Sequence, residues 1–281
     1  MNSVHNPDKK IFLISGASSG IGNEIAKYLA TQGNIIFAGA RKESDIQELN
    51  QYENITGIQL DVTIPEQINS TINLIRNTYG YLDVLINNAG IPGWGAIMDL
   101  KPDYFKEVIE VNLIGYIRLS QAGYPLLRNS AKFPIIFNIS SQGAKYAFPF
   151  WAPYHITKFG VRAFSDALRR ELIPFNIRVC ELQLGPFKSK AFEKQKQLLE
   201  DYKMKQIKSE FTPRLLKMFE MIVLNPKRKE KSPIKVAKLI EKLSSQLKYK
   251  VRYEPGRKRL ASTVLTKFPP KWVDKMLLKK F

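Results

Sequence analysis

Short apolar runs alternate with longer amphipathic segments through most of the chain. Seven runs rich in Ile, Val and Phe predict strands, at Ile11–Ser15, Asn34–Ala38, Thr56–Leu60, Leu82–Ile86, Ile135–Ile139, Arg178–Leu182 and Tyr249–Tyr253. Such continuous apolar runs are typical of strands that are covered on both faces. The segments between them predict helices, for example Gly20–Gln32, Pro65–Tyr79, Pro102–Leu127 and Pro153–Ile173. This alternation predicts an α/β fold, a doubly wound parallel sheet of about seven strands.

The length of the chain fits a single domain, because α/β domains of this size are common. We therefore expect residues 1–281 to form one domain. One region, 187–231, departs from the alternation of strands and helices. It is helical by composition and contains Pro213 and Pro226. We interpret it as a substrate-cap insertion, and 255–281 as a basic C-terminal extension.

Positive charge is concentrated in the last third of the chain. From Lys188 onward there are 27 basic and 9 acidic residues, whereas the residues before it carry 17 and 16. The only cysteine, Cys180, excludes an internal disulfide and suits a reducing compartment. The polar stretch Asn2–Lys10 does not resemble a secretory signal, and no apolar run is long enough to span a membrane. These features predict a cytoplasmic protein.

A glycine-rich segment follows the first predicted strand and leads into the first predicted helix. Glycines there allow a tight turn and a close approach to a pyrophosphate, and the helix N-terminus attracts its charge. An ordinary strand–helix turn is the alternative, since glycine spacing alone is a weak signal. The candidate cofactor residues of this segment are Gly16, Ser18, Ser19, Gly20, Ile21 and Gly22.

Tyr154 and Lys158 are spaced to lie one turn apart on one face of a helix. A phenol has a pKa near 10, and a neighbouring ammonium favours its ionised form. The pair alone is common by chance, but Ser141 follows a predicted strand thirteen positions before Tyr154. Ser140, one position earlier, is the alternative candidate for the serine that acts beside Tyr154. Ligands of such sheets bind beyond the carboxyl ends of the strands, where these serines lie.

Together these motifs resemble the short-chain dehydrogenase/reductase family, and look similar to its steroid and retinol dehydrogenase branch. The resemblance runs from about Ile11 to Ser189, with Ser15 where Thr is more usual, and it implies a Rossmann-like fold. It also implies that Tyr154 is the acid/base, that Lys158 lowers the Tyr154 pKa and holds the nicotinamide ribose, and that Ser141 polarises the substrate carbonyl. Asn112 would organise a water in a proton relay. The cofactor contacts that it implies are Asp61 and Val62 at the adenine, Asn88, Ala89 and Gly90 after the fourth strand, and Gly185 and Ser189 near the nicotinamide.

Cofactor choice is read at the end of the second strand, where an acidic residue would bind the ribose of NAD. This chain has Ala40-Arg41-Lys42 instead. Arg41 offers charge-assisted hydrogen bonds to a 2′-phosphate, which favours NADP(H). A solvated loop arginine is the alternative.

The remaining chemistry-bearing residues suggest no second site. Cys180 is interpreted as a core residue, and His155 is expected to face away from Tyr154 on helical geometry. Neither has companions at metal-ligand spacing, so no metal site is proposed.

Aromatic residues near the predicted motifs bear on the substrate. Phe148, Phe150, Trp151 and Trp94 lie near the expected cleft and favour an apolar alcohol or carbonyl substrate of lipid, retinoid or steroid type, although ordinary packing explains them equally well. A non-catalytic NADP-binding sensor is one rival, against which the full set of four catalytic residues argues. Nucleic-acid binding through the basic third is the other. No nucleic-acid partner is expected, because that region carries no recognised motif.

Two kinds of association are predicted. Members of the family commonly pair through the helix that bears Tyr and Lys, so we expect a homodimer or homotetramer, with Phe159, Val161 and Phe164 as core or interface residues. Near the C-terminus, Trp272, Val273, Met276, Leu277 and Phe281 form a stripe flanked by lysines. Such a helix suits peripheral contact with a membrane surface. Packing on the domain, covering the cleft and simple solvation are its alternatives.

Overall fold

The computed structural model describes residues 9–187, 209–223, 231–256 and 267–278. Seven strands form one sheet in the order β3-β2-β1-β4-β5-β6-β7, and every pairing is parallel. The order reverses between β1 and β4, the point at which sheets of this kind bind ligands. The strands are β1 (Ile11–Ile14), β2 (Ile35–Ala40), β3 (Ile55–Gln59), β4 (Val84–Asn87), β5 (Ile135–Ser141), β6 (Arg178–Leu184) and β7 (Arg252–Tyr253).

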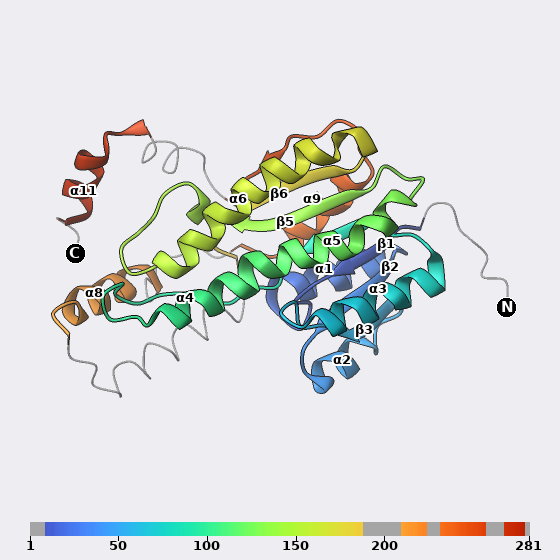
Figure 1. The fold of residues 1–281 in the computed structure, drawn as a ribbon, viewed down its shortest axis with the longest axis horizontal. Helices are drawn as coiled ribbons and strands as arrows, with labels where there is room; N and C mark the ends of the chain where they lie inside the picture. Colours follow the sequence, from blue (N-terminus) through green and yellow to red (C-terminus); the bar gives the residue numbers. More distant parts are fainter. Residues whose placement is uncertain (1–8, 188–208, 224–230, 257–266, 279–281) are drawn as a thin grey trace.

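Helices cover both faces of this sheet (Figure 1). Phe12 and Ile14 of β1 point into one core, shared with α1 and α9, whereas Ile11 and Leu13 point into a second core, shared with α3 and α5. This alternation explains why β1 is apolar at every position. The helices are α1 (Gly20–Thr31), α2 (Glu43–Leu49), α3 (Pro65–Tyr79), α4 (Pro102–Ile109), α5 (Gly115–Arg128), α6 (Ala152–Leu172), α8 (Thr212–Val223), α9 (Ile234–Ser244) and α11 (Pro270–Leu278), with short turns of other helical types at η1 (Glu110–Ile114), η2 (Gln142–Ala144) and η3 (Ile173–Phe175).

The predicted fold class is therefore confirmed, and the element boundaries moved by a few residues. β5 and β6 each run two residues further than expected, so β5 ends at Ser141. β7 shrinks to Arg252–Tyr253, because it is an edge strand that pairs only with β6.

The helix expected over Pro102–Leu127 is interrupted. α4 gives way to one π-helical turn, η1, before α5 continues. Such turns carry an extra residue and often mark functional sites. Gly115 begins α5 where a Cβ atom would lie 2.5 Å from Cγ2 of Val62, so the helix packs closely beneath the end of β3. A hydrophobic period cannot reveal this single inserted residue.

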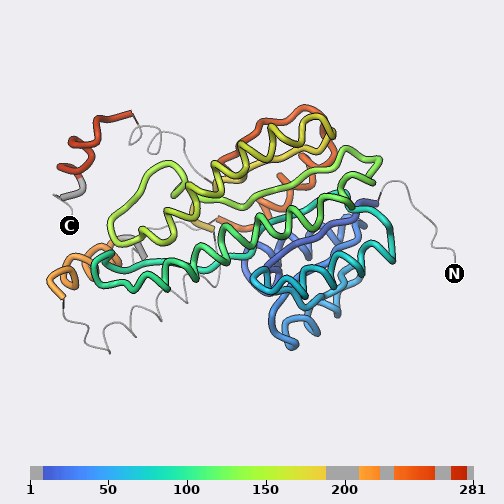
Figure 2. The backbone as a smooth tube through the Cα atoms, in the orientation of Figure 1, coloured from blue at the N-terminus to red at the C-terminus, as the bar shows by residue number. Residues whose placement is uncertain are grey.

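Within 187–231, the region expected to form a substrate cap, the structure describes 187, 209–223 and 231. The helix there, α8, lies beside the loops that precede α4 and α6 (Figure 2). Leu215 and Phe219 of α8 are fully buried against Trp94, and the Phe219 and Trp94 rings are 4.5 Å apart between centroids. α8 therefore covers the aromatic loops at the carboxyl end of the sheet.

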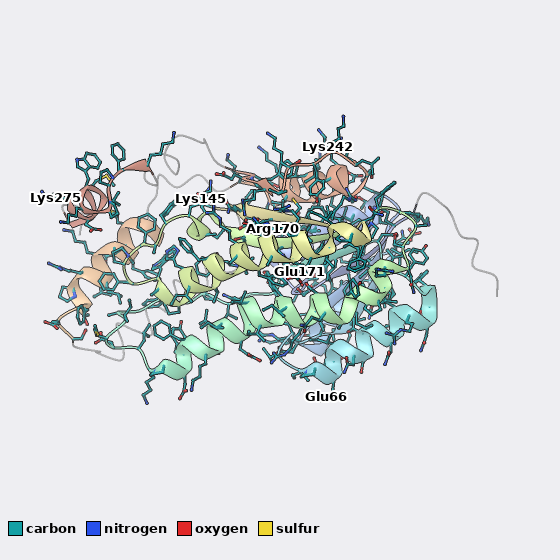
Figure 3. The ribbon with its side chains drawn as sticks, turned by 45° about the horizontal axis from the view of Figure 1, so that its top comes forward. Glu66, Lys145, Arg170, Glu171, Lys242 and Lys275 are labelled. Carbon is teal, nitrogen blue, oxygen red and sulfur yellow. The ribbon has the colours of Figure 1, made fainter. Side chains whose placement is uncertain are left out.

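Much of the basic charge in the last third is exposed. Lys242 on α9 and Lys275 on α11 both point outward (Figure 3). α11 lies apart from the sheet in Figure 2, and Trp272 on it is 52% exposed. None of the helices in the described ranges has the length and apolar composition needed to cross a bilayer.

Candidate active site

The glycine-rich loop after β1 is tied to the segment that follows β4. Ser15 Oγ accepts hydrogen bonds from the backbone N–H groups of Asn88 (3.0 Å) and Ala89 (3.1 Å). Asn88 Nδ2 donates in return to the carbonyl oxygens of Ser15 and Gly16. Gly16 has φ +68°, and a Cβ atom there would lie 2.8 Å from Cα of Ala89. The structure thus brings the glycine loop and Asn88-Ala89 together at the switch point of the sheet.

The N-terminus of α1 directly follows this loop. Ser19 is the N-cap residue, but its side chain makes no capping hydrogen bond, and the first turn contains no acidic residue. The free N–H groups and the positive end of the helix dipole therefore suit the phosphates of a nucleotide. Gly22 permits the close packing, because a Cβ atom there would lie 2.3 Å from the carbonyl oxygen of Gly16. These residues fit a dinucleotide.

Arg41 lies directly after β2, near the end of β3. Its Nη1 atom is 3.8 Å from Oδ2 of Asp61, and its side chain is 61% exposed. Asp61 Oδ1 already accepts hydrogen bonds from the backbone N–H and the hydroxyl of Thr63. Exposed ion pairs of this length contribute little to stability, so Arg41 can turn to another anion at low cost. Val62 is buried beneath Gly115.

Ser141 and Tyr154 meet at the carboxyl end of the sheet, Ser141 as the last residue of β5 and Tyr154 in the first turn of α6. Burial raises the pKa of Tyr154, and a hydrogen bond with the Ser141 side chain lowers it in part. Ser141 Oγ also accepts a hydrogen bond from the N–H of Gly143 (3.1 Å). Ser140, its competitor in the sequence, is buried and lines the same cavity.

Lys158 is buried one turn beyond Tyr154 and donates a hydrogen bond to the carbonyl oxygen of Ile139 (3.1 Å). Its Nζ atom lies 5.5 Å from the ring centroid of Tyr116 and 5.6 Å from that of Tyr154. Burial lowers the pKa of Lys158 to about 8, and the carboxylate of Glu181 opposes this effect. The lowering of the Tyr154 pKa that was expected from Lys158 does not appear among these side chains, because burial dominates both groups.

Asn112 is fully buried in the π turn. Its Oδ1 atom accepts a hydrogen bond from the N–H of Ile91 (2.8 Å), and its Nδ2 atom donates to the carbonyl oxygen of the same residue (2.9 Å) and to Oγ1 of Thr157 (3.3 Å). Asn112 therefore joins the loop after β4 to α6. Gly90 packs against it, since a Cβ atom there would lie 3.3 Å from Oδ1 of Asn112.

One cavity of about 320 Å³ gathers the four predicted catalytic residues and four of the predicted cofactor residues. Ile21 and Asn88 line it on the side of the glycine-rich loop, and aromatic side chains of the loops before α4 and α6 line it on the other side. The predicted site residues among its lining are Ile21, Asn88, Gly90, Asn112, Ser141, Tyr154, Lys158 and Gly185. Arg41 and Asp61 are not among the lining residues. Ser189 lies outside the described residues.

The expectation that His155 faces away from Tyr154 is wrong. The His155 ring lies 6.1 Å from the Tyr154 ring between centroids, is 4% exposed and lines the cavity. Its Nδ1 atom lies 2.9 Å from the carbonyl oxygen of Gly143. The residue was missed because helical geometry places it away from Tyr154, whereas the loop after β5 folds back over that side of α6.

Other cavity residues carry no signal in the sequence. Gln142 lines it from η2, and Tyr146 from the loop before α6. Tyr116 stands behind Lys158 and donates a hydrogen bond to the carbonyl oxygen of Ile139 (3.1 Å). Only the packing of α5 against β5 brings Tyr116 to this place.

Comparison with known proteins agrees with this arrangement. A family described as short chain dehydrogenase matches residues 10–199. The chain belongs to this family. Mouse mitochondrial D-beta-hydroxybutyrate dehydrogenase is 37% identical over 190 residues, which cover 63% of this chain and 54% of that protein. A putative ketoacyl reductase of Streptomyces coelicolor is 36% identical over 182 residues, covering 61% and 68%. The chain thus spans about half the length of the hydroxybutyrate dehydrogenase that it matches.

Solved structures of the family share the fold. A short-chain dehydrogenase from Streptomyces avermitilis superposes with a TM-score of 0.77 at 24% identity, covering 97% of this chain and 94% of that one. A variant of actinorhodin polyketide ketoreductase with NADPH superposes with a TM-score of 0.69 at 31% identity, covering 84% and 90%.

Proposed function

We propose that this chain is an NADP(H)-dependent oxidoreductase that interconverts an alcohol and a ketone or aldehyde. The observation that carries the proposal is the meeting of Ser141, Tyr154 and Lys158 in one cavity, which opens beside the glycine-rich loop. Membership of the family supports it. The relatives named above are, by name, a hydroxybutyrate dehydrogenase and a ketoacyl reductase, so the proposal does not select the steroid and retinol branch.

In this mechanism the protein positions the reactants and moves one proton. Ser141 and Tyr154 hold the substrate oxygen, and Tyr154 donates its hydroxyl proton to that oxygen during reduction. NADPH, when bound, supplies the hydride that the carbonyl carbon accepts. Lys158 holds its ammonium group behind Tyr154, and Asn112 fixes the adjoining loop.

The choice of NADP(H) over NAD(H) rests on Arg41. The end of β2 lacks an acidic residue. The ion pair between Arg41 and Asp61 is long and exposed, so breaking it would cost little free energy. A 2′-phosphate would replace that pair with charge-assisted hydrogen bonds. The actinorhodin ketoreductase variant, whose structure contains NADPH, is consistent with this choice.

An apolar substrate fits the aromatic lining of the cavity, to which Phe148 and Trp151 contribute together with Tyr154. α8 packs on Trp94 and so covers the aromatic loops beside the cavity. This contact supports the proposal that 187–231 is a substrate cap, and that it belongs to a single domain. We also propose that the protein is cytoplasmic, that it associates as a homodimer or homotetramer, and that it contacts a membrane surface through α11.

The proposal is tested with purified protein, NADPH or NADH, and a panel of apolar ketones, by following the nicotinamide absorbance. We expect turnover with NADPH. Tyr154→Phe should abolish it and leave NADPH affinity within a few-fold, because only the proton donor is lost. Tyr79→Phe, which removes a hydroxyl from a ring that packs on Phe37 in the core, is the matched control and should behave like wild type. Near-normal turnover by Tyr154→Phe would exclude the mechanism. The absence of turnover with both NADPH and NADH would exclude the function.

A further inference from the structure

Thr157 lies between Tyr154 and Lys158 near the start of α6, and its side chain is fully buried. Its Oγ1 atom donates a hydrogen bond to the carbonyl oxygen of Tyr154 (2.7 Å) and accepts one from Nδ2 of Asn112 (3.3 Å). A hydroxyl group has one proton to donate, and an amide nitrogen only donates, so the two bonds have these directions. The hydroxyl group thus links the backbone of Tyr154 to the side chain of Asn112.

The Asn112 end of this link is fixed by further hydrogen bonds. Oδ1 of Asn112 accepts from the N–H of Ile91, and Nδ2 also donates to the carbonyl oxygen of Ile91. Both amide protons are therefore used, and the side chain has one orientation. Ile91 lies next to Gly90 in the loop after β4, and both residues line the cavity. Through Asn112, Thr157 therefore connects the first turn of α6 to this loop.

The first turn of α6 lacks a side-chain cap. Its N-cap residue, Trp151, makes no capping hydrogen bond, and the turn contains no acidic residue. Helix ends of this kind depend on tertiary contacts to stay in place. Gly93 of the loop after β4 packs on this turn, since a Cβ atom there would lie 3.0 Å from the backbone nitrogen of Tyr154. The hydrogen bonds of Thr157 join the same loop and the same turn.

We infer that Thr157 is a positioning residue, whose hydroxyl group holds the first turn of α6 against Asn112 and so places the phenol of Tyr154. The inference rests on the proposed function, because the phenol must lie within hydrogen-bond reach of the substrate oxygen to give its proton. A displacement of about 1 Å can lower a rate by roughly a hundredfold. Thr157 is not among the described residues that line the cavity, so its loss should lower kcat more than it changes binding.

Ser165 is a matched control farther along α6. Its Oγ atom donates to the carbonyl oxygen of Val161 (2.7 Å) and accepts from Nδ2 of Asn138 (2.9 Å). The two links have the same chemistry, and both hydroxyl residues are buried. Ser165 lies about three turns beyond Tyr154, however, and its link ends on β5 rather than on the loop after β4. A purely structural role would make the loss of either hydroxyl group alike in its effects.

The experiment compares variants in the reduction of the apolar ketone that wild type reduces fastest with NADPH. Thr157→Val removes both hydrogen bonds and keeps nearly the same shape. We expect it to lower kcat by roughly tenfold to a hundredfold, with the KM of the ketone and the Kd of NADPH within about threefold of wild type. Thr157→Ser keeps the hydroxyl group and should restore most of kcat. Ser165→Ala should lose stability and keep the wild-type kcat.

Thermal unfolding shows which variants are folded. Thr157→Ala, which sets no methyl group against the carbonyl oxygen of Tyr154, should show the same loss of kcat and decides the question if Thr157→Val does not fold. A wild-type kcat in a folded variant without the hydroxyl group would overturn the inference. So would an equal loss of kcat in Ser165→Ala, or a loss that Thr157→Ser does not restore.

Hydrogen exchange separates this inference from the proposed function, because it needs no turnover. In an α-helix the N–H of Lys158 bonds to the carbonyl oxygen of Tyr154. In the cofactor-free protein we expect Thr157→Val to exchange amide protons of residues 154–158 roughly tenfold faster than wild type, and Ser165→Ala to leave them unchanged. If wild type reduces no ketone but Thr157→Val opens this turn, the proposed reaction fails and the link stands. If wild type reduces the ketone and Thr157→Val keeps both kcat and slow exchange, the link fails and the reaction stands.

Discussion

The ammonium nitrogen of Lys158 lies 5.6 Å from the centre of the Tyr154 ring, on the next turn of the same helix. Glu181, buried in β6, partly offsets the effect of burial on Lys158, and its carboxylate is itself paired with Arg252 (2.8 Å). The protein therefore keeps a cation in an environment that disfavours it. This is the arrangement expected where a group is retained for chemistry rather than for stability.

Lys158→Met should stabilise the cofactor-free protein at neutral pH while abolishing turnover and weakening NADPH binding. The pKa of Lys158 falls from 10.5 to about 8 on folding, so the unfolded chain binds more protons between these values. Wild-type stability is therefore lowered at and below about pH 8 and recovers as the pH rises toward 10.5. We expect the variant to unfold with a free energy about 1–3 kcal/mol higher at neutral pH, and this gain to shrink above pH 9. Urea denaturation at several pH values measures it.

Lys242→Met is the matched control, because Lys242 is exposed on α9 and should show no such pH-dependent gain. A Lys158→Met protein that is less stable than wild type at neutral pH would show that the ammonium group contributes more through its hydrogen bond to Ile139 than it costs by burial.

Arg41→Ala should weaken NADPH binding and leave NADH binding almost unchanged, since only NADPH has a 2′-phosphate for the guanidinium to bind. The loss should be about 1.5–3 kcal/mol, as is usual for a hydrogen bond to a charged group. Fluorescence titration with both cofactors measures it. Arg76→Ala removes an exposed arginine from α3 and controls for net charge. Equal losses for the two cofactors, or a wild-type preference for NADH, would contradict the assignment.

The predicted homo-oligomer should depend on the exposed face of α6. Of the three candidates, Val161 is fully buried and belongs to the core, Phe164 is partly buried, and Phe159 is 42% exposed. Phe159→Asp should shift the protein toward smaller species in sedimentation velocity, because a carboxylate is costly to bury in an apolar interface. Phe175→Asp changes a side chain of η3 that is 43% exposed, and it should leave the distribution of oligomeric species unchanged. A wild-type protein that is monomeric at every concentration would refute the prediction.

The α11 segment should bind anionic membranes. Phe268 and Trp272 are exposed, and their rings stack with centroids 4.4 Å apart, close to the exposed Lys271 and Lys275. Each basic residue near an acidic surface adds roughly 1 kcal/mol, and the aromatic pair would enter the interface. We expect salt-sensitive co-sedimentation with vesicles that contain phosphatidylserine, and its loss when the chain is cut after Pro270.

Trp272→Ala should reduce that binding, whereas Leu247→Ala, which removes an apolar side chain 62% exposed outside α11, should not. Vesicle binding by the truncated chain at the full level would contradict the membrane role. A raised KM for apolar ketones in the truncated chain, without any vesicle binding by the full one, would make α11 a cover for the cleft. Leu277 and Phe281 of the predicted stripe cannot be placed in this argument, since their side chains lie outside the described residues.

The sequence by itself determined the fold class, because strands that are buried on both faces must be apolar at every position, as Ile11–Ile14 are. It also determined the candidate residues that follow strands or share one helix face, such as Ser141, Tyr154 and Lys158, since local periodicity decides those relationships. Only the tertiary structure decided the surroundings of each group. The π turn that buries Asn112, Tyr116 behind Lys158, the turn of His155 into the cavity and the burial that lowers the pKa of Lys158 all depend on contacts between segments far apart in the chain. Such contacts set the desolvation and the hydrogen-bond partners of a side chain, and no spacing along the sequence records them.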